Sequence, residues 1–248
     1  MTAVFEAAVR DEVCRLGRPD TRWLSTGYDG GEYRGPAAYN CTVPEGWSRT
    51  DLDAYVAERL AAAGFDGRDA PVLLTGVDQR HARRARLGPV EAVATAGVSN
   101  PAVLPIDSAE RTTADARSTP SDGDDHAGTV NVVVGTVRAL APGALPNLLT
   151  VAAEAKAATL LELVGVPGTT TDAVVAACDP EGDPAQFSGS ATAVGSAARA
   201  CVRDAVAASL ASRHPEGADD AGDAGDAESG VVTDERAVVS ALPPAPDH

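Results

Sequence analysis

The sequence predicts an α+β fold, in which a single layered domain has a mixed, largely antiparallel sheet and two long helices. Apolar strand patterns follow one another in the first half of the chain, whereas strand and helix patterns alternate in the second half. The length of 248 residues also fits one domain of ordinary size with room for tails.

The first half begins with a predicted hairpin. Residues 21–28 form a strand that ends at the turn Asp29-Gly30-Gly31, and residues 33–43 return as its partner. A helix then runs from residue 48 or 50 to residue 63, and Gly64 ends it. The remaining elements follow in the order strand, strand, strand, helix, strand, helix, at residues 71–77, 90–98, 128–140, 143–164, 171–178 and 190–211.

Two polar segments lie outside these elements. Residues 107–127 contain no Val, Leu, Ile or aromatic residue, and residues 213–248 are rich in Ala, Gly and Asp. Together they hold 15 of the 36 acidic residues. Neither buries enough apolar surface to offset the entropy cost of ordering. We therefore expect one domain at residues 1–212, with an acidic disordered insertion at 107–127 and an acidic disordered tail at 213–248.

The charge balance restricts the partners. The formal net charge of −16 argues against proteins that bind nucleic acids or anionic membranes, because both need positive surface. No apolar run reaches 18 residues and no basic-then-apolar leader opens the chain, so we expect a cytoplasmic protein. Every basic residue except Lys156 is Arg, and Asp outnumbers Glu, which predicts adaptation to molar salt. Screening over roughly 3 Å at 1 M weakens the repulsion between carboxylates.

Several kinds of chemistry lack their sequence signals. The four cysteines and four histidines show no metal-ligand spacing, so we expect no protein-bound metal and free thiols in a reducing compartment. The phosphate-binding loop, the dinucleotide-binding turn, the GxSxG nucleophile turn and the HExxH zinc motif are all absent. A cluster of arginines at residues 80–86 fits either a solvated basic turn or a contact to an anionic or polar group.

Three groups of polar residues interrupt apolar patterns. Asn131 lies within a run of valines in a predicted strand, where a buried amide serves either as a structural clamp or as a ligand contact. On the helix at 147–163, Thr150 and Glu154 share one face, whereas Lys156 lies about 200° around from Glu154. Where arginine is the habitual cation, a single lysine indicates a site role more than a solvated face.

The third group follows that helix. Gly168, Thr169, Thr170 and Thr171 precede Asp172 at the start of a predicted strand. Such a loop is often only a turn with local hydrogen bonds. Because helix, loop and strand are consecutive, we expect Glu154, Lys156 and Asp172 to approach one cleft.

The order of these motifs resembles that of the adenosylcobinamide amidohydrolase family. The similarity covers about residues 20–210, and its motifs are collinear. They are Leu24-Ser25-Thr26-Gly27-Tyr28-Asp29-Gly30-Gly31, Ala38-Tyr39-Asn40, Leu73-Leu74-Thr75-Gly76-Val77, residues 94–101, Gly128-Thr129-Val130-Asn131, residues 149–158, residues 168–175 and residues 187–192. The chain departs from the family pattern at Thr170, where a proline is common, and in its insertion at 107–127.

The resemblance implies hydrolysis of adenosylcobinamide to adenosylcobyric acid and aminopropanol, in the salvage of corrinoids for cobalamin synthesis. The partner would be a small corrinoid, with cobalt arriving inside the substrate and no further cofactor. Association into homo-oligomers stays open, since Ala-rich helices can pair.

The chemistry of amide hydrolysis then suggests roles for the candidate residues. Glu154 or Asp172 would be the general base, and Lys156 would stabilise the oxyanion or protonate the amine. An activated water or a Thr hydroxyl would attack. Substrate contacts would come from Asn131, Thr150, Thr169, Thr170, Thr171, Ser25, Asn40, Asn100, Gly30 and Gly31.

Two alternatives remain from the sequence. The chain would bind a corrinoid without cleaving it if hydrolysis had been lost. It would also fit a hydrolase that cleaves itself through an internal nucleophile such as Thr129 or Thr170, which predicts two fragments in place of an intact chain.

Overall fold

A computed structural model describes residues 3–44, 49–67, 69–98, 101–102, 129–213 and 236–242. Within these residues nine strands form one mixed sheet, which confirms the predicted α+β class. The sheet order is β11-β5-β6-β7-β9-β2-β3-β4, and β1 pairs with β2. The strands are β1 (Glu6–Arg10), β2 (Val13–Ser25), β3 (Gly31–Thr42), β4 (Val72–Thr75), β5 (Arg83–Leu87), β6 (Val90–Ala96), β7 (Val130–Thr136), β9 (Ala173–Cys178) and β11 (Val238–Ala241).

The helices account for the rest of the regular structure. The predicted long helices are α2 (Ala144–Val164) and α3 (Ala193–Arg213), and the shorter predicted helix is α1 (Leu52–Ala62). A short 3-10 helix spans Gln79–His81, and β8 (Ala139–Leu140) pairs with β10 (Pro184–Ala185). None of the described helices has the length and apolar character needed to cross a membrane.

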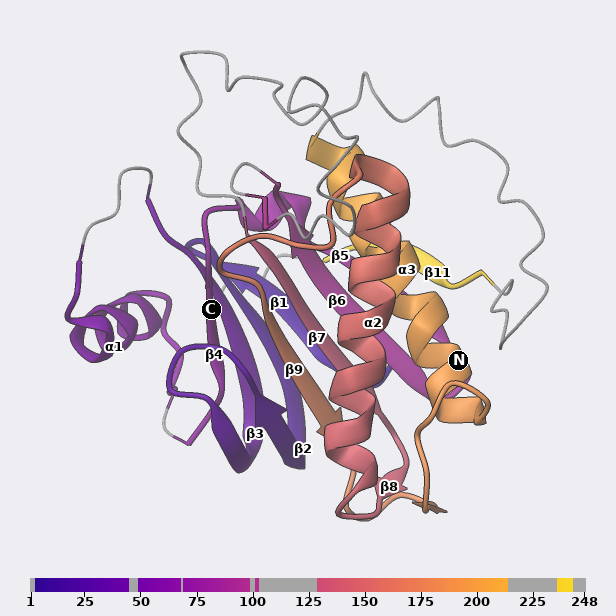
Figure 1. Ribbon diagram of the computed structural model, residues 1–248. Helices are drawn as coiled ribbons and strands as arrows, with labels where there is room; N and C mark the ends of the chain where they lie inside the picture. Colours follow the sequence, from indigo (N-terminus) through magenta and orange to yellow (C-terminus); the bar gives the residue numbers. More distant parts are fainter. Residues whose placement is uncertain are drawn as a thin grey trace.

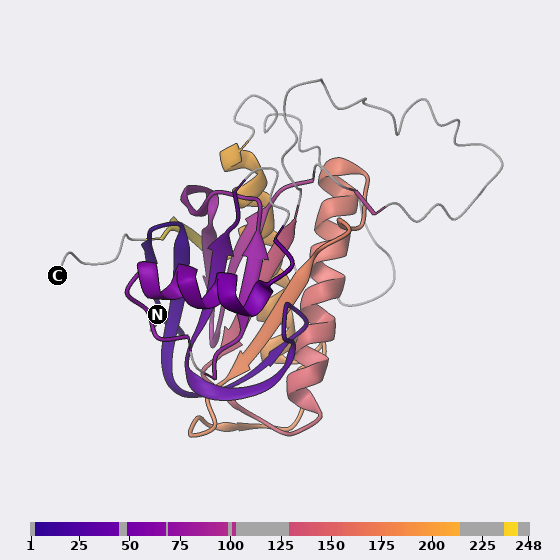
Figure 2. The ribbon, with the colours of Figure 1, turned by 90° about the vertical axis from the view of Figure 1, so that its left-hand side faces the viewer.

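The sheet folds back on itself, so that two of its layers face each other. The β2–β3 ribbon bends at an irregularity between Gly17 and Thr21, which Figure 2 shows at the bottom of the view. The first part of β2 pairs with β1, and its last part pairs with β9. Phe5 stacks on Trp23 between the layers, with ring centroids 5.6 Å apart.

Helices cover the two outer faces of this folded sheet. Helices α2 and α3 pack against β5, β6, β7 and β9 through Ala, Val and Leu side chains, and they lie in front of the sheet in Figure 1. Helix α1 covers the outer face of β3 and β4 through Val56 and Leu60. This Ala/Val/Leu core agrees with the low aromatic content of 4%.

The strand directions bring several predicted motifs to one edge of the sheet. Strands β7 and β9 are parallel neighbours, and β6 and the end of β2 run antiparallel to them. The starts of β7 and β9 therefore lie beside the ends of β6 and β2. We call this the upper edge, because it is at the top in Figure 1. The residues at this edge are Ser25, Ala96, Val130 and Asp172.

The structure differs from the prediction in its Arg-rich and polar strands. One of the two alternatives for the arginine cluster was a solvated turn, but residues 83–87 form strand β5. Residues 238–241, predicted to lie in a disordered tail, form β11 on the edge of β5. Asp204 of α3 holds this strand, since it accepts a hydrogen bond from the Ala237 N–H at 2.6 Å and pairs with Arg236. The rest of the tail and the insertion at 107–127 lie outside the described residues.

Glu91 gives the fold a pH dependence of known sign. This buried carboxylate accepts a hydrogen bond from the Val4 N–H at 2.9 Å and lies 3.1 Å from Arg86 and 3.7 Å from Arg84. Burial raises the pKa of Glu91 above its ordinary 4.5, against the opposing effect of these three partners.

A raised pKa means that the unfolded chain releases this proton first, so Glu91 contributes most stability at low pH and loses it as pH rises through the folded pKa. We expect the unfolding free energy of the wild type, minus that of Glu91→Gln, to decrease from pH 4 upward. Urea unfolding of both proteins at matched salt measures this difference, and an increase with pH would contradict the assignment.

Candidate active site

The predicted approach of Lys156 to the Thr-Asp loop is confirmed. Lys156 lies on the sheet-facing side of α2 and forms an ion pair with Asp172, the residue before β9. Each of the two side chains is 10% exposed. A buried ion pair is stable only when its geometry is good and further hydrogen bonds satisfy its polar atoms, because removing both charges from water is costly.

The Asp172 carboxylate has a donor at each of its acceptor positions. Its Oδ2 accepts from the Lys156 ammonium and from the Thr169 backbone N–H at 2.9 Å. Its Oδ1 accepts from the Val130 backbone N–H at 2.8 Å and from the Thr169 hydroxyl. Two carboxylate oxygens offer about four acceptor positions. Asp172 is therefore fixed in place, and in the resting site its acceptor positions are taken by these four donors.

The Lys156 ammonium, in contrast, has N–H donors that Asp172 does not use. An ammonium carries three N–H donors, and the bond to Asp172 uses one of them. Among the described residues Lys156 makes no other hydrogen bond. Two N–H groups of this buried cation therefore have no acceptor among the described residues, and a ligand oxygen would suit them.

Gly168 lies directly over the pair. A Cβ atom at this position would be 2.5 Å from Asp172 Oδ2 and 3.0 Å from Lys156 Nζ, so a larger residue would have to displace the pair or the loop. The Gly168 carbonyl accepts from the Ala102 N–H at 2.8 Å, and Pro101 pairs with Thr169. The loop is thereby fastened to the chain that follows β6.

Other predicted residues belong to the segments that end or begin at the upper edge. The Thr129 and Thr171 hydroxyls are 2.7 Å apart, and Thr170 is exposed. Ser25 ends β2 and accepts from the Gly27 N–H at 3.1 Å. Its neighbour Thr26 accepts from the Val174 N–H of β9 at 2.9 Å. The turn containing Gly30 and Gly31 follows these residues, and Asn100 lies outside the described residues.

Glu154 does not approach the pair, contrary to the expectation of one cleft with Lys156 and Asp172. Glu154 and Thr150 are both exposed on α2, and the Thr150 hydroxyl donates to the Pro146 carbonyl. Lys156 is buried on another face of the helix, as the angle of about 200° between positions 154 and 156 requires. The geometry thus leaves Asp172 as the carboxylate beside Lys156.

Asn131 lies on the opposite face of the sheet from Lys156. Side chains alternate along β7, so Val130 and Val132 face the helices whereas Val133 faces the folded-back layer, and Asn131 with it. Asn131 Nδ2 donates to Asn40 Oδ1 at 3.0 Å and to the Leu74 carbonyl at 2.9 Å. Asn40 Nδ2 in turn donates to the Thr95 hydroxyl at 3.0 Å. This amide chain joins β3, β4, β6 and β7, which is the geometry of a structural clamp.

Comparison with known proteins agrees with the arrangement of these motifs. The family model described as adenosylcobinamide amidohydrolase matches residues 4–218. A protein of Halobacterium salinarum named adenosylcobinamide amidohydrolase is 55% identical over 237 residues, which cover 95% of this chain and 99% of that protein. The chain belongs to the adenosylcobinamide amidohydrolase family. The halophilic source of this relative agrees with the Arg- and Asp-rich composition.

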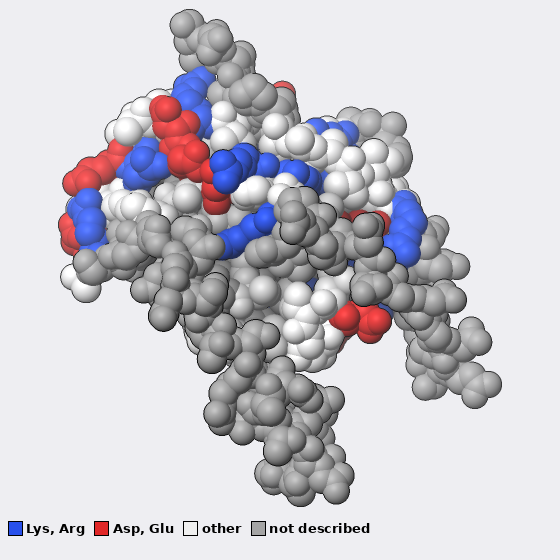
Figure 3. Space-filling view, turned by 90° about the horizontal axis from the view of Figure 1, so that it is seen from above, with Lys and Arg blue, Asp and Glu red and all other residues white. Residues whose placement is uncertain are grey.

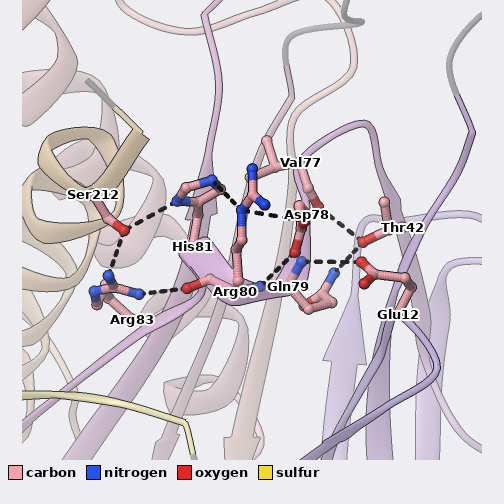
Figure 4. Close-up of polar contacts among 9 residues, drawn as sticks. All are labelled: Glu12, Thr42, Val77, Asp78, Gln79, Arg80, His81, Arg83 and Ser212. Atoms are coloured by element: carbon pink, nitrogen blue, oxygen red, sulfur yellow. Dashed lines mark hydrogen bonds and ion pairs between the residues drawn. The ribbon is translucent and has the colours of Figure 1, made fainter. Parts of the chain in front are cut away.

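This family member has a second polar group at the upper edge, formed by His81 and Arg80 of the basic cluster at 80–86 together with Ser212. His81 Nδ1 lies 3.0 Å from the Ser212 hydroxyl, and the Arg80 Nε–H donates to His81 Nε2 at 3.0 Å (Figure 4). In the tautomer whose Nε2 accepts from Arg80, the His81 proton is on Nδ1, which donates to Ser212. Burial, and after it the charge of Arg80, lowers the pKa of His81. His81 is thus unable to act as a base for Ser212 in this arrangement.

The face of the molecule that is seen from above carries both signs of charge. Its described side chains include basic groups beside acidic ones (Figure 3). An open depression of about 390 Å³, which contains none of the candidate residues, lies at the opposite end beside Leu87, Pro89 and Ser196.

Among the described residues no three His, Cys, Asp or Glu side chains gather as metal ligands do.

Proposed function

We propose that the Lys156–Asp172 site cleaves the amide that joins aminopropanol to a corrin propionate in adenosylcobinamide. The products are adenosylcobyric acid and aminopropanol, and the role is corrinoid salvage. Family membership and the name of the Halobacterium salinarum relative support the reaction. The geometry supports the place where it occurs.

The observation that carries this proposal is a buried ammonium that uses one of its three N–H donors among the described residues. Amide hydrolysis passes through a tetrahedral intermediate whose oxygen becomes negative, and fixed donors in a water-poor site stabilise that charge strongly. The two N–H groups of Lys156 that Asp172 does not use would bind the carbonyl oxygen. Asp172 holds the ammonium in place and balances its charge in the absence of substrate.

Purified protein in molar salt tests the proposal. Incubation with adenosylcobinamide is expected to release free aminopropanol and leave the chain intact at 25.1 kDa on a denaturing gel. Bound corrinoid without free aminopropanol would support the binding module instead. Two fragments of the chain would support the self-cleaving hydrolase.

Substitution of Gly168 tests whether the loop must contact the pair. Gly168→Ala is expected to push the loop away from Asp172 and Lys156, because its Cβ has no room. Displacing a catalytic group by about 1 Å costs on the order of 10²-fold in rate, so we expect a loss of that size in kcat. Gly143→Ala is the matched control, since nothing lies within 4 Å of its Cβ position. Equal rates for both variants would contradict the role of the loop.

Location and cofactors are part of the same proposal. Among the described residues all four cysteines are buried and free, which fits a reducing compartment such as the cytoplasm. The proposed donors are side chains of the chain, and hydrolysis transfers no electrons, so we propose no cofactor beyond the cobalt within the substrate. The proposed partner is the corrinoid alone.

A further inference from the structure

We propose that the Thr169 hydroxyl is the nucleophile of this reaction and that the corrin propionate becomes an ester of Thr169 before water releases it. The inference rests on the proposed function, and it concerns the attacking atom, for which water is the alternative.

The hydrogen bonds of Asp172 carry the argument. Three of its four donors are N–H groups, two from the backbone and one from the Lys156 ammonium. Backbone amides keep their protons, and a proton from the ammonium would create no attacking oxygen. The fourth donor is the Thr169 hydroxyl. If Asp172 is the base, the proton that it takes without losing a hydrogen bond is the one that activates Thr169.

A water molecule does not fit this arrangement as well. To be activated by Asp172, water would have to displace one of the four donors, three of which are fixed by the backbone or by the ion pair. Thr169 is held at two points, because its N–H and its hydroxyl bond to different oxygens of the same carboxylate. Thr169 Oγ1 and Lys156 Nζ thus bond to the two oxygens of one carboxylate. The remaining N–H groups of Lys156 would hold the substrate carbonyl close to Thr169 Oγ1.

The other threonines near the pair are placed differently. The Thr129 and Thr171 hydroxyls bond to each other at 2.7 Å, and Thr170 is exposed. Thr169 is buried, with 7% of its surface exposed. Thr129 is buried as well, but its hydroxyl bonds to Thr171, so the contact of Thr169 with Asp172 sets Thr169 apart.

The step balances within the named groups. Thr169 Oγ1 bonds to the amide carbon while its proton moves to Asp172 Oδ1, and Lys156 stabilises the oxyanion. The C–N bond then breaks, and the proton on Asp172 passes to the leaving nitrogen of aminopropanol. Water attacks the ester and gives its proton to Asp172, the carboxylic acid leaves with the water oxygen, and the proton returns to Thr169 Oγ1.

Hydroxylamine and two variants test the inference on the full chain in molar salt. We expect wild type to convert part of the substrate to the corrin hydroxamate, because hydroxylamine competes with water for the ester. Acid-quenched protein is expected to carry a corrinoid adduct that peptide mass spectrometry places on Thr169. Thr169→Val is expected to lose at least about 10³-fold in aminopropanol release. Thr169→Ser, which keeps the hydroxyl, is expected to retain activity within about tenfold.

The outcomes separate the two proposals. Release of aminopropanol with neither hydroxamate nor adduct, or with normal rate in Thr169→Val, would overturn the Thr169 nucleophile and leave the proposed function standing. An adduct on another residue would also overturn it. No release by the wild type would contradict the proposed function itself, and the inference with it.

Discussion

Asp172→Asn is expected to remove nearly all turnover and to destabilise the protein. The asparagine NH₂ would replace an oxygen that now accepts two hydrogen bonds, so it would face either the Val130 N–H or the Lys156 ammonium. The buried ammonium would lose its counter-charge. Breaking a buried ion pair in this way costs about 3–5 kcal/mol of unfolding free energy. The variant would lack the proposed base, and Lys156 would no longer be held in position. We therefore expect kcat to fall by at least about 10³-fold.

Asp179 provides the matched control. It follows the other end of β9, forms an ion pair with Arg18, and lies away from the upper edge. Asp179→Asn is expected to keep kcat near that of the wild type and to lose less stability, since its side chain is 20% exposed. Aminopropanol release and urea unfolding in molar salt measure both effects. Similar kcat values for the two variants would remove Asp172 from the mechanism.

Asn131→Ala is expected to have the largest effect on stability among the substrate-contact candidates. The substitution would leave Asn40 Oδ1 and the Leu74 carbonyl without their donor. Each buried polar group left unpaired costs about 1–3 kcal/mol, and a small cavity adds to this. We therefore expect a loss of about 3 kcal/mol or more in the free energy of unfolding.

The same variant distinguishes a clamp from a substrate contact. Asn131 Oδ1 is buried and has no partner among the described residues, so a ligand donor would be free to use it. If Asn131 is a clamp, stability falls and the KM of the remaining folded enzyme changes little. An unchanged unfolding free energy with a large rise in KM would instead make Asn131 a substrate residue. Thr95→Val, which removes the acceptor of Asn40 Nδ2, is expected to lose less stability than Asn131→Ala.

The Lys156–Asp172 pair was predictable because its signals are local. A single lysine in a chain that otherwise uses arginine marks one residue, and Asp172 follows the same helix after a short loop. The elements on both sides have clear apolar patterns, so their order and approximate ends follow from sequence. The four donors of Asp172 were not predictable in this way. The Val130 contact depends on the pairing of β7 with β9, where Asn131 lies beside Ala173.

Apart from Glu154, whose place follows from the helix angle alone, the errors have a common cause in long-range pairing. Because side chains alternate along β7, Asn131 points away from Lys156. Which face of the sheet Asn131 takes depends on the register of β7 with its neighbours, and this register cannot be derived from the sequence. Strand β5 consists mostly of arginine and leucine, and β1 and the first part of β2 carry charges. Such strands lack a strand signal of their own and form because neighbours offer hydrogen bonds and partners for the charges.

The central claim is that the N–H donors of the buried Lys156 ammonium that Asp172 does not use stabilise the transition state of amide cleavage. Single-turnover release of aminopropanol by Lys156→Met tests it most directly, with Glu162→Gln, an exposed residue of the same helix, as the control. The account predicts that Lys156→Met binds adenosylcobinamide but cleaves it about 10³-fold more slowly, while Glu162→Gln cleaves at the wild-type rate. Cleavage by folded Lys156→Met within about tenfold of the wild-type rate would contradict it.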